Sequence, residues 1–161
     1  GNKQKGSLSS SNDEIINTIN PSGISKLKFE FVHIIGRGAF GKVWKVHHKT
    51  NNTSFALKEI SKAYILDTDF TQAINYEVEI LSQMDHPFII NLHYAFQDKF
   101  NLYLVMDLLK GGDLRYHLDK TNKFSEQKTK FLAACVIMAL EYLHSNNIMH
   151  RDIKPENLVF D

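Results

Sequence analysis

The sequence predicts an α+β protein in which an antiparallel five-stranded unit with one helix leads into a second, mainly helical unit. Three observations carry this prediction. Hydrophobic residues alternate with a period of two over much of residues 29–60, they recur at helical spacing over residues 70–84 and 125–144, and glycine or proline separates these stretches. The 161 residues are 43% hydrophobic, which allows a sizeable core and excludes a wholly disordered chain.

Charge and cysteine content exclude several classes of protein. The formal net charge is +1, so no strong field favours nucleic acid or an anionic membrane as a partner. No apolar run approaches the roughly 20 residues that a membrane-spanning helix needs. The single cysteine, Cys135, cannot form an internal disulfide, which suits a reducing, cytoplasmic location.

Residues 1–25 differ from the rest, because they are rich in serine, asparagine, lysine and glycine. We expect a flexible N-terminal arm, in which Ile15, Ile16 and Ile19 could form one amphipathic turn on the domain. The N-terminal glycine has two explanations. It could be a site of myristoylation, which would allow membrane association, or it could be a cloning scar. The acylation motif favours Ser or Thr where this chain has Lys5.

The first strands are predicted from alternation and turn residues. Phe29, Phe31, His33 and Ile35 alternate with Glu30, Val32 and Ile34, and the strand pattern resumes after Gly36–Gly41 at Val43, Trp44 and Val46. An asparagine pair marks residues 49–53 as a turn, and residues 55–60 continue as a third strand. Residues 29–60 therefore predict an antiparallel meander.

The remaining elements follow the same rules. The 70–84 helix places Ala73, Ile74, Ile80 and Leu81 on one face, and His86-Pro87 ends it. Residues 89–96 and 101–109 predict two further strands around a polar turn. Asp113 is expected to cap a short helix over 114–119, and Ser125 a longer one to about residue 144. The longer helix carries one stripe of larger side chains at Phe131, Cys135, Met138 and Tyr142.

A glycine-rich segment is the first candidate site. It consists of Gly36, Arg37, Gly38, Ala39, Phe40, Gly41, Lys42 and Val43. Glycines let backbone N–H groups approach a phosphate, although they also form ordinary hairpin loops. In a dinucleotide-binding fold such a loop opens a helix, with an acid about 20 residues later. Here a strand pattern follows and Lys58 stands 22 positions past Gly36, which favours a hairpin over nucleotide phosphates and disfavours an oxidoreductase.

Lys58 and Glu77 form the second candidate pair. A lysine within an apolar strand is costly to bury unless it is paired, although it could also face water from an edge strand. On the predicted helix Glu77 lies within the apolar seam, whereas Glu79 groups with polar residues roughly 200° around the axis. We therefore predict that Glu77 faces the sheet and neutralises Lys58.

The segment from His150 to Asn157 is the most specific motif. Asp152 can accept a hydroxyl proton, Lys154 can stand near a transferring phosphoryl group, and Asn157 offers an oxygen ligand for Mg²⁺. Separately such residues are usually solvated loop residues. Together and in this order they favour phosphoryl transfer.

These motifs resemble those of eukaryotic protein kinases over residues 29–161. Lys154 after His-Arg-Asp is similar to the serine/threonine type. Residues 86–98 and 101–118 resemble the AGC group, and DLLKGGDLRYHL resembles its YANK subfamily. The resemblance implies a kinase N-lobe over 26–106, then a hinge and partial C-lobe over 107–161, with ATP and Mg²⁺ as cofactors and Ser/Thr hydroxyls of proteins as acceptors.

The resemblance also implies site residues. Ile35, Val43, Ala56 and Val159 would line the adenine slot behind the gatekeeper Met106, and Asp107 and Leu109 would offer backbone groups to the adenine edge. Asp113 would meet the ribose or a basic substrate residue, and Glu156 would attract a substrate arginine. A regulatory partner or hydrophobic tail would dock beside the Glu77 helix.

Residue 161 precedes any DFG motif, activation loop or APE motif, and Asp161 has no following Phe-Gly. Since the DFG aspartate holds the main Mg²⁺ in this family, we expect negligible transfer by the 161-residue chain, with marginal stability. The alternative function is a non-catalytic nucleotide-binding or scaffold module derived from a kinase.

Overall fold

The structure, a computed structural model, describes residues 23–38, 41–67 and 71–161, which divide into two units. The first unit comprises the described residues up to Met84 together with Asn91–Leu108, and the second comprises Asp85–Ile90 and Leu109–Asp161. Most of the predicted arm, including the Ile15–Ile19 turn, lies outside the described residues. Among the described residues, no helix has the length and apolar character needed to cross a membrane.

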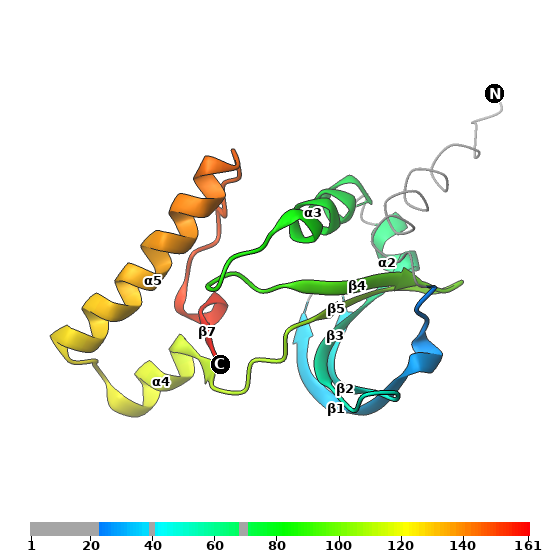
Figure 1. The fold of residues 1–161 in the computed structure, drawn as a ribbon, viewed down its shortest axis with the longest axis horizontal. Coiled ribbons are helices and arrows are strands. Elements are labelled where there is room, and N and C mark those ends of the chain that lie inside the picture. The colour runs from blue at the N-terminus through cyan, green and yellow to red at the C-terminus, as the bar shows by residue number, and fades with distance from the viewer. Residues whose placement is uncertain (1–22, 39–40, 68–70) are drawn as a thin grey trace. The chain divides into compact units, whose positions relative to one another are not determined.

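The first unit is built on the predicted five-stranded antiparallel sheet (Figure 1). Its strand order is β1-β2-β3-β5-β4, so the first three strands form the predicted meander. The strands are β1 (Phe29–Gly38), β2 (Gly41–His48), β3 (Ser54–Ser61), β4 (Leu92–Gln97) and β5 (Asn101–Met106). The two strands predicted at 89–96 and 101–109 are confirmed, but both are shorter than predicted. Residues 89–91 and 107–109 lie outside them.

The strict alternation predicted for β1 is wrong after Phe31. Register with β2 shifts between Phe31 and His33 and again between Ile34 and Gly36. Each irregularity changes which side chains face inward. Ile34 is therefore half-buried, whereas Ile35 is 44% exposed.

Helix α3 (Thr71–Gln83) covers one face of the sheet (Figure 1). Ile74 and Val78 pack from the helix against Ile60 and Leu104 of the sheet, and all four side chains are buried. Ala73, predicted to face the core, is exposed, because Ile74 and Val78, four residues apart, form the inward stripe and Ala73 lies roughly 100° around the helix axis from Ile74. The turn of helix α2 (Lys62–Asp67), which the sequence did not predict, follows β3 directly.

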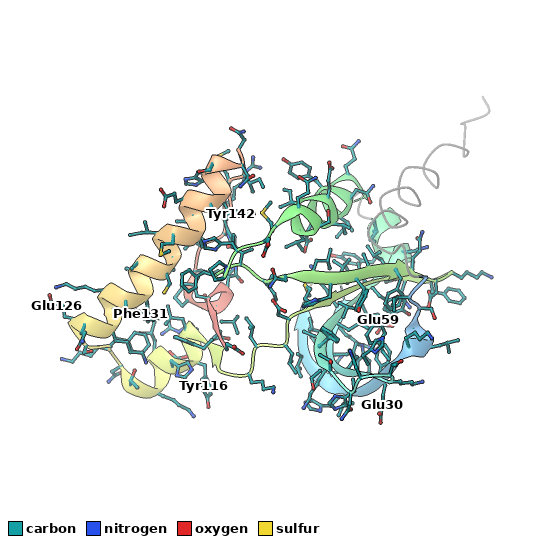
Figure 2. The ribbon with its side chains drawn as sticks, viewed as in Figure 1. Glu30, Glu59, Tyr116, Glu126, Phe131 and Tyr142 are labelled. Carbon is teal, nitrogen blue, oxygen red and sulfur yellow. The ribbon has the colours of Figure 1, made fainter. Side chains whose placement is uncertain are left out.

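The opposite face of the sheet carries an aromatic core. Its buried members are Phe29, Val46, Phe55, Leu57, Phe96, Tyr103 and Val105. The Tyr103 hydroxyl donates to Asp98 Oδ2 at 2.8 Å and accepts from Lys26 Nζ at 3.1 Å. Glu59 joins this network through an ion pair with Lys26 Nζ at 3.7 Å, and it also accepts from Trp44 Nε1 at 2.8 Å. Figure 2 shows Glu59 within the curl of the sheet, with Glu30 on its outer rim.

Acid should weaken the β4–β5 turn. Burial opposes ionisation of Asp98, but the N–H groups of Phe100 and Asn101 donate to its Oδ1 at 2.8 Å each, and its pKa falls below the usual 3.8. Asp98 therefore adds stability above its unfolded pKa, and this contribution is lost as pH falls through the lower folded value. We expect the thermal midpoint of the chain to fall between about pH 5 and pH 2.

Thermal melts of Asp98→Asn across this range should show a shallower decline than wild type. Glu30→Gln, which removes an exposed carboxyl from the rim of the same sheet, is the control. Identical pH slopes for Asp98→Asn and wild type would contradict the linkage.

The second unit begins its helices at the predicted caps. Asp113 accepts from Tyr116 N–H at the start of α4 (Leu114–Thr121), and Ser125 accepts from Lys128 N–H at the start of α5 (Glu126–Ser145). A turn of 3₁₀ helix, η2 (Pro155–Asn157), precedes β7 (Val159–Phe160). The short pairing of β7 with β6 (Gly112–Asp113) was not predicted, because two-residue strands carry no periodic signal.

Only part of the predicted stripe on α5 is covered. Phe131 is 67% and Met138 is 49% exposed, whereas the Tyr142 ring stacks on His86 at 4.9 Å between centroids. The Tyr142 hydroxyl also accepts from Asp85 N–H at 3.2 Å. Figure 2 shows Glu126, Phe131 and Tyr142 in turn along this helix.

Candidate functional site

The strand register gathers the predicted pocket residues of the first unit on one face of the sheet. Val43 pairs with Lys58, and Ala56 pairs with Met106. Residues paired across antiparallel strands share a face, as do residues two apart on one strand. Val43, Ala56, Lys58 and Met106 therefore lie on the face that α3 covers further along. Ala56 is buried, and the exposed Ile35 lies on β1.

The glycine-rich segment forms the predicted hairpin, since β1 and β2 pair as far as Gly38 and Gly41. Arg37 and Lys42 are exposed within it. Ala39 and Phe40, predicted to belong to the phosphate loop, lie outside the described residues.

The glycines of the hairpin are not equivalent. A Cβ on Gly41 would lie 1.8 Å from the Glu59 carbonyl oxygen, whereas one on Gly38 would meet no atom of the described residues within 4 Å. A Cβ on Gly36 would make only an ordinary contact, 3.7 Å from Val43 Cβ. Gly41 is therefore required by the neighbouring strand, and Gly36 and Gly38 leave backbone open to a ligand.

Replacing Gly41 should cost stability. We expect Gly41→Ala to lower the free energy of unfolding by about 1–3 kcal/mol, because β3 must move to admit the methyl group. Gly38→Ala, with open space at its Cβ, is the matched control and should change stability little. Urea titrations of the two variants measure the difference, and equal stabilities would refute this assignment.

Lys58 and Glu77 form the pair that the sequence predicts. Lys58 Nζ donates to Glu77 Oε1 at 2.7 Å, from β3 to α3. Their side chains are 23% and 39% exposed, so the pair is reachable from solvent. Glu79, two residues on, is exposed, as its position on the helix indicates. The chain thus holds the Lys58 ammonium group, paired with Glu77, at the face shared with Val43 and Ala56.

Asp107 follows the last residue of β5, where the chain leaves the first unit. Its carboxylate accepts from the backbone N–H and side-chain amide of Asn91, at 2.9 and 2.8 Å, and from His93 Nε2 at 2.6 Å. Burial opposes ionisation, but these donors, His93 foremost, hold the pKa of Asp107 below its usual range. The Asp107 N–H donates to the Asn91 carbonyl at 3.3 Å. Leu109, half-buried, begins the second of the two segments that make up the second unit.

In the second unit, Asp113 and Glu156 share their surroundings with a cation. Arg115 Nη2 donates to Asp119 Oδ1 at 2.6 Å, and α4 packs against η2, which carries Glu156. The pKa of the Arg115 guanidinium is raised first by Asp119 and further by Glu156 and Asp113. The acids expected to attract a basic substrate residue thus already have a positive neighbour.

Asp113 has a structural task as well. Its Oδ1 accepts from the Tyr116 N–H at 2.7 Å as the cap of α4. It also lines an open recess of about 550 Å³ together with Lys110, His117 and Lys120. This surface is therefore mixed in charge rather than acidic.

The catalytic segment predicted at 150–157 forms a tight loop in the second unit. Asp152 Oδ2 accepts from Lys154 Nζ and from Asn157 Nδ2, each at 2.8 Å. Asn157 Nδ2 also donates to the Asp152 backbone carbonyl at 2.8 Å, and Arg151 takes a left-handed backbone with φ of 65°. The structure therefore brings Asp152, Lys154 and Asn157 together. Val159, on β7, is 46% exposed.

The partners of Asp152 keep it ionised. The hydrogen bond from Lys154, followed by that from Asn157, lowers the pKa of Asp152 below its usual range, and Asp152 in turn raises the pKa of Lys154. Both donors occupy Oδ2, so Oδ1 can accept from a hydroxyl group. A carboxylate with a low pKa is a weak base near neutral pH, which suits orientation of a hydroxyl better than its full deprotonation.

The second unit also offers a donor for a hard cation. Asn157 uses its amide nitrogen toward Asp152, which turns its amide oxygen away from these bonds. Such an oxygen fits Mg²⁺, which prefers oxygen ligands and retains several waters. Within residues 23–38, 41–67 and 71–161, no cluster of three His, Cys, Asp or Glu side chains could hold a metal ion by itself.

Sequence reasoning missed three polar partners. Asp119 could have been found, since it lies four residues from Arg115 on a predicted helix. Asn91 and His93 gave no such signal, because their contact with Asp107 depends on an irregularity of β4 between Leu92 and Tyr94.

Comparison with known proteins gives a consistent picture. The family model described as "Protein kinase domain" matches residues 29–161. A probable serine/threonine-protein kinase of Dictyostelium discoideum is 46% identical over 148 residues, 92% of this chain and 32% of that protein. The cAMP-dependent protein kinase catalytic subunit of the same organism is 43% identical, over 83% of this chain and 21% of its own length. Serine/threonine-protein kinase 32C of Mus musculus is 40% identical, over 83% of this chain and 27% of its own length.

The chain thus spans about a third or less of these relatives, 32% in the first case. The matched region contains the described sheet, α3 and the 150–157 loop, so the α+β prediction corresponds to the kinase fold. By its sequence match and by this architecture, the chain belongs to the protein kinase domain family.

Proposed function

We propose that the complete protein transfers a phosphoryl group from Mg-ATP to serine or threonine hydroxyls of proteins. The observation that carries the proposal is the Lys58–Glu77 pair, 2.7 Å apart on the sheet face that also bears Val43, Ala56 and Met106. An ammonium group held in place by an acid in this way can bind nucleotide phosphates from a fixed position. Serine/threonine kinases among the relatives support the same acceptor class.

Each candidate residue has a role in this reaction. The open backbone at Gly36 and Gly38 would approach the phosphates, and Lys58 would neutralise their charge. Asp152 would accept the hydrogen of the acceptor hydroxyl, while Lys154 would stabilise charge on the group in transfer. Mg²⁺, with Asn157 as one ligand, would neutralise charge on the phosphate oxygens when bound. Phosphoryl transfer depends mainly on positioning and charge, which these residues supply.

We assign the protein, more finely, to the AGC group and to a YANK-like subfamily acting in the cytoplasm. The DLLKGGDLRYHL segment supports this assignment, together with relatives that include the cAMP-dependent kinase catalytic subunit and a RAC family homologue. A hydrophobic tail or regulatory partner would dock on the α3 side of the sheet, where Tyr76 is 60% exposed.

The test is phosphate transfer by the complete protein to an array of Ser- and Thr-containing peptides. Transfer from ATP to these hydroxyls supports the proposal. Nucleotide binding without transfer to any peptide or protein acceptor would overturn it in favour of a non-catalytic module.

Substrate preference should depend on Arg115. Because this guanidinium lies in the field of Asp113 and Glu156, we expect only a modest preference for Arg or Lys near the acceptor residue. Arg115→Gln should strengthen that preference by about threefold to tenfold, since the acids lose their cation. The control is Lys130→Gln, which removes a cation from a separate exposed ion pair on α5. Neither variant changes Arg151 of the 150–157 loop. An unchanged ranking of peptides in Arg115→Gln would contradict this expectation.

A further inference from the structure

Residue 107, directly after β5, is held through both its backbone and its side chain. Three donors converge on its carboxylate, namely Asn91 N–H, Asn91 Nδ2 and His93 Nε2, at 2.9, 2.8 and 2.6 Å. Its own N–H donates to the Asn91 carbonyl at 3.3 Å. Backbone and side chain of Asp107 are therefore both bound to residues 91–93, all within the first unit.

The irregularity of β4 makes this arrangement possible. Leu92 pairs with Met106 and Tyr94 pairs with Val105, so His93 is an extra residue on the β4 side. A bulge of this kind redirects a side chain. His93 reaches past the end of β5 to Asp107, and its ring also lies 5.0 Å from that of Phe55.

These bonds leave one backbone group of residue 107 unused. The N–H is taken by Asn91, and among the described residues no loop hydrogen bond ends on the Asp107 carbonyl oxygen. The resemblance to kinases implies that backbone groups of Asp107 and Leu109 meet the adenine edge, and this carbonyl is the backbone group of Asp107 that these bonds leave for it. Fixing the N–H and the side chain of residue 107 holds its Cα, so ψ is the one soft backbone angle left between these bonds and the following peptide.

We infer that Asp107 is a positioning residue of the nucleotide site, whose carboxylate, held by Asn91 and His93, orients the peptide that meets the base. The inference rests on the proposed function, because it assumes a nucleotide at this end of the sheet. Asn91 and His93 act only through Asp107. The ionised state of Asp107, favoured by these donors, is the form that accepts all three bonds.

The chain offers a matched control at the other end of β5. Asp98 also accepts three hydrogen bonds, from Phe100 N–H, Asn101 N–H and the Tyr103 hydroxyl. Asp98→Asn and Asp107→Asn therefore remove comparable carboxylates that bracket one strand. Only Asp107 adjoins the segment expected to contact adenine.

The experiment measures steady-state kinetics in ATP and hydrogen exchange in the complete protein. Asp107→Asn should raise the KM for ATP about tenfold with kcat nearly unchanged, and should speed exchange at residues 107–109. Asp107→Glu, which keeps a carboxylate, should recover part of the affinity. Asp98→Asn should leave the KM within about twofold of wild type, even if it lowers the melting temperature as much.

Any of three results would overturn the inference. The KM for ATP could be equal in Asp107→Asn and wild type, it could rise equally in Asp98→Asn, or exchange at residues 107–109 could be unchanged in Asp107→Asn. A wild-type protein that neither binds nor turns over ATP would instead refute the proposed function, and the exchange measurement would still decide whether Asp107 orders this segment.

Discussion

In the complete protein, Asp152→Asn should lower kcat by roughly 10²- to 10⁴-fold while changing the KM for ATP little. The amide would keep the size of the side chain. It would lose the negative charge that receives Lys154 and that an acceptor hydroxyl needs as a hydrogen-bond partner. Since the interaction with the hydroxyl develops with transfer, its loss should appear in kcat. Stopped-flow or quench measurement of a single turnover separates this step from product release.

Glu126→Gln is the matched control for Asp152→Asn. It removes one carboxylate from an exposed pair with Lys130 on α5, at 2.6 Å, away from the 150–157 loop. Both substitutions remove one charge and one exposed ion pair with lysine. Comparable rates in the two variants would show that Asp152 acts only as a surface charge.

The second large effect is expected at Glu77. In the complete protein, Glu77→Gln should reduce kcat/KM for ATP by about 10²-fold, because Lys58 loses the charged partner 2.7 Å away that fixes its position. The Coulomb attraction of a partly exposed pair stabilises the fold only modestly, so the melting temperature should change little. A large loss of activity with a small loss of stability is the expected signature.

Glu79→Gln provides the comparison on the same helix. Glu79 is exposed, and its change should leave kcat/KM near wild type. Full activity of Glu77→Gln in single-turnover assays would remove the Lys58–Glu77 pair from the proposed site. Equal losses in both variants would indicate a general effect of charge on α3.

Local patterns predicted the five strands of the sheet, the helices α3, α4 and α5, and one long-range contact. The choice of Glu77 over Glu79 needed only helical geometry, and the structure contains that pair. Asp113 and Ser125 were identifiable as caps, because a short polar side chain before a helical pattern has a local partner.

What the sequence could not predict depends on strand register. The exposed Ile35 and the His93–Asp107 contact both follow from irregular pairing, which depends on the neighbouring strand rather than on local alternation. The positive charge of Arg115 near Asp113 and Glu156 was not predicted, for another reason. The charge of a surface is the sum of all nearby groups, and the two acids were considered alone.

The close approach of Gly41 to β3 bears on how natural variation in this loop is interpreted. A glycine found at this position in every relative would indicate the tight packing of two strands, because Glu59 O would lie only 1.8 Å from any added Cβ. We expect this glycine to be retained even in relatives that no longer bind nucleotides. The fold does not require glycine at Gly36 or Gly38 in the same way. Replacement of those two glycines, with Gly41 retained, would therefore be an early sign that a relative has lost enzymatic activity and serves as an adaptor.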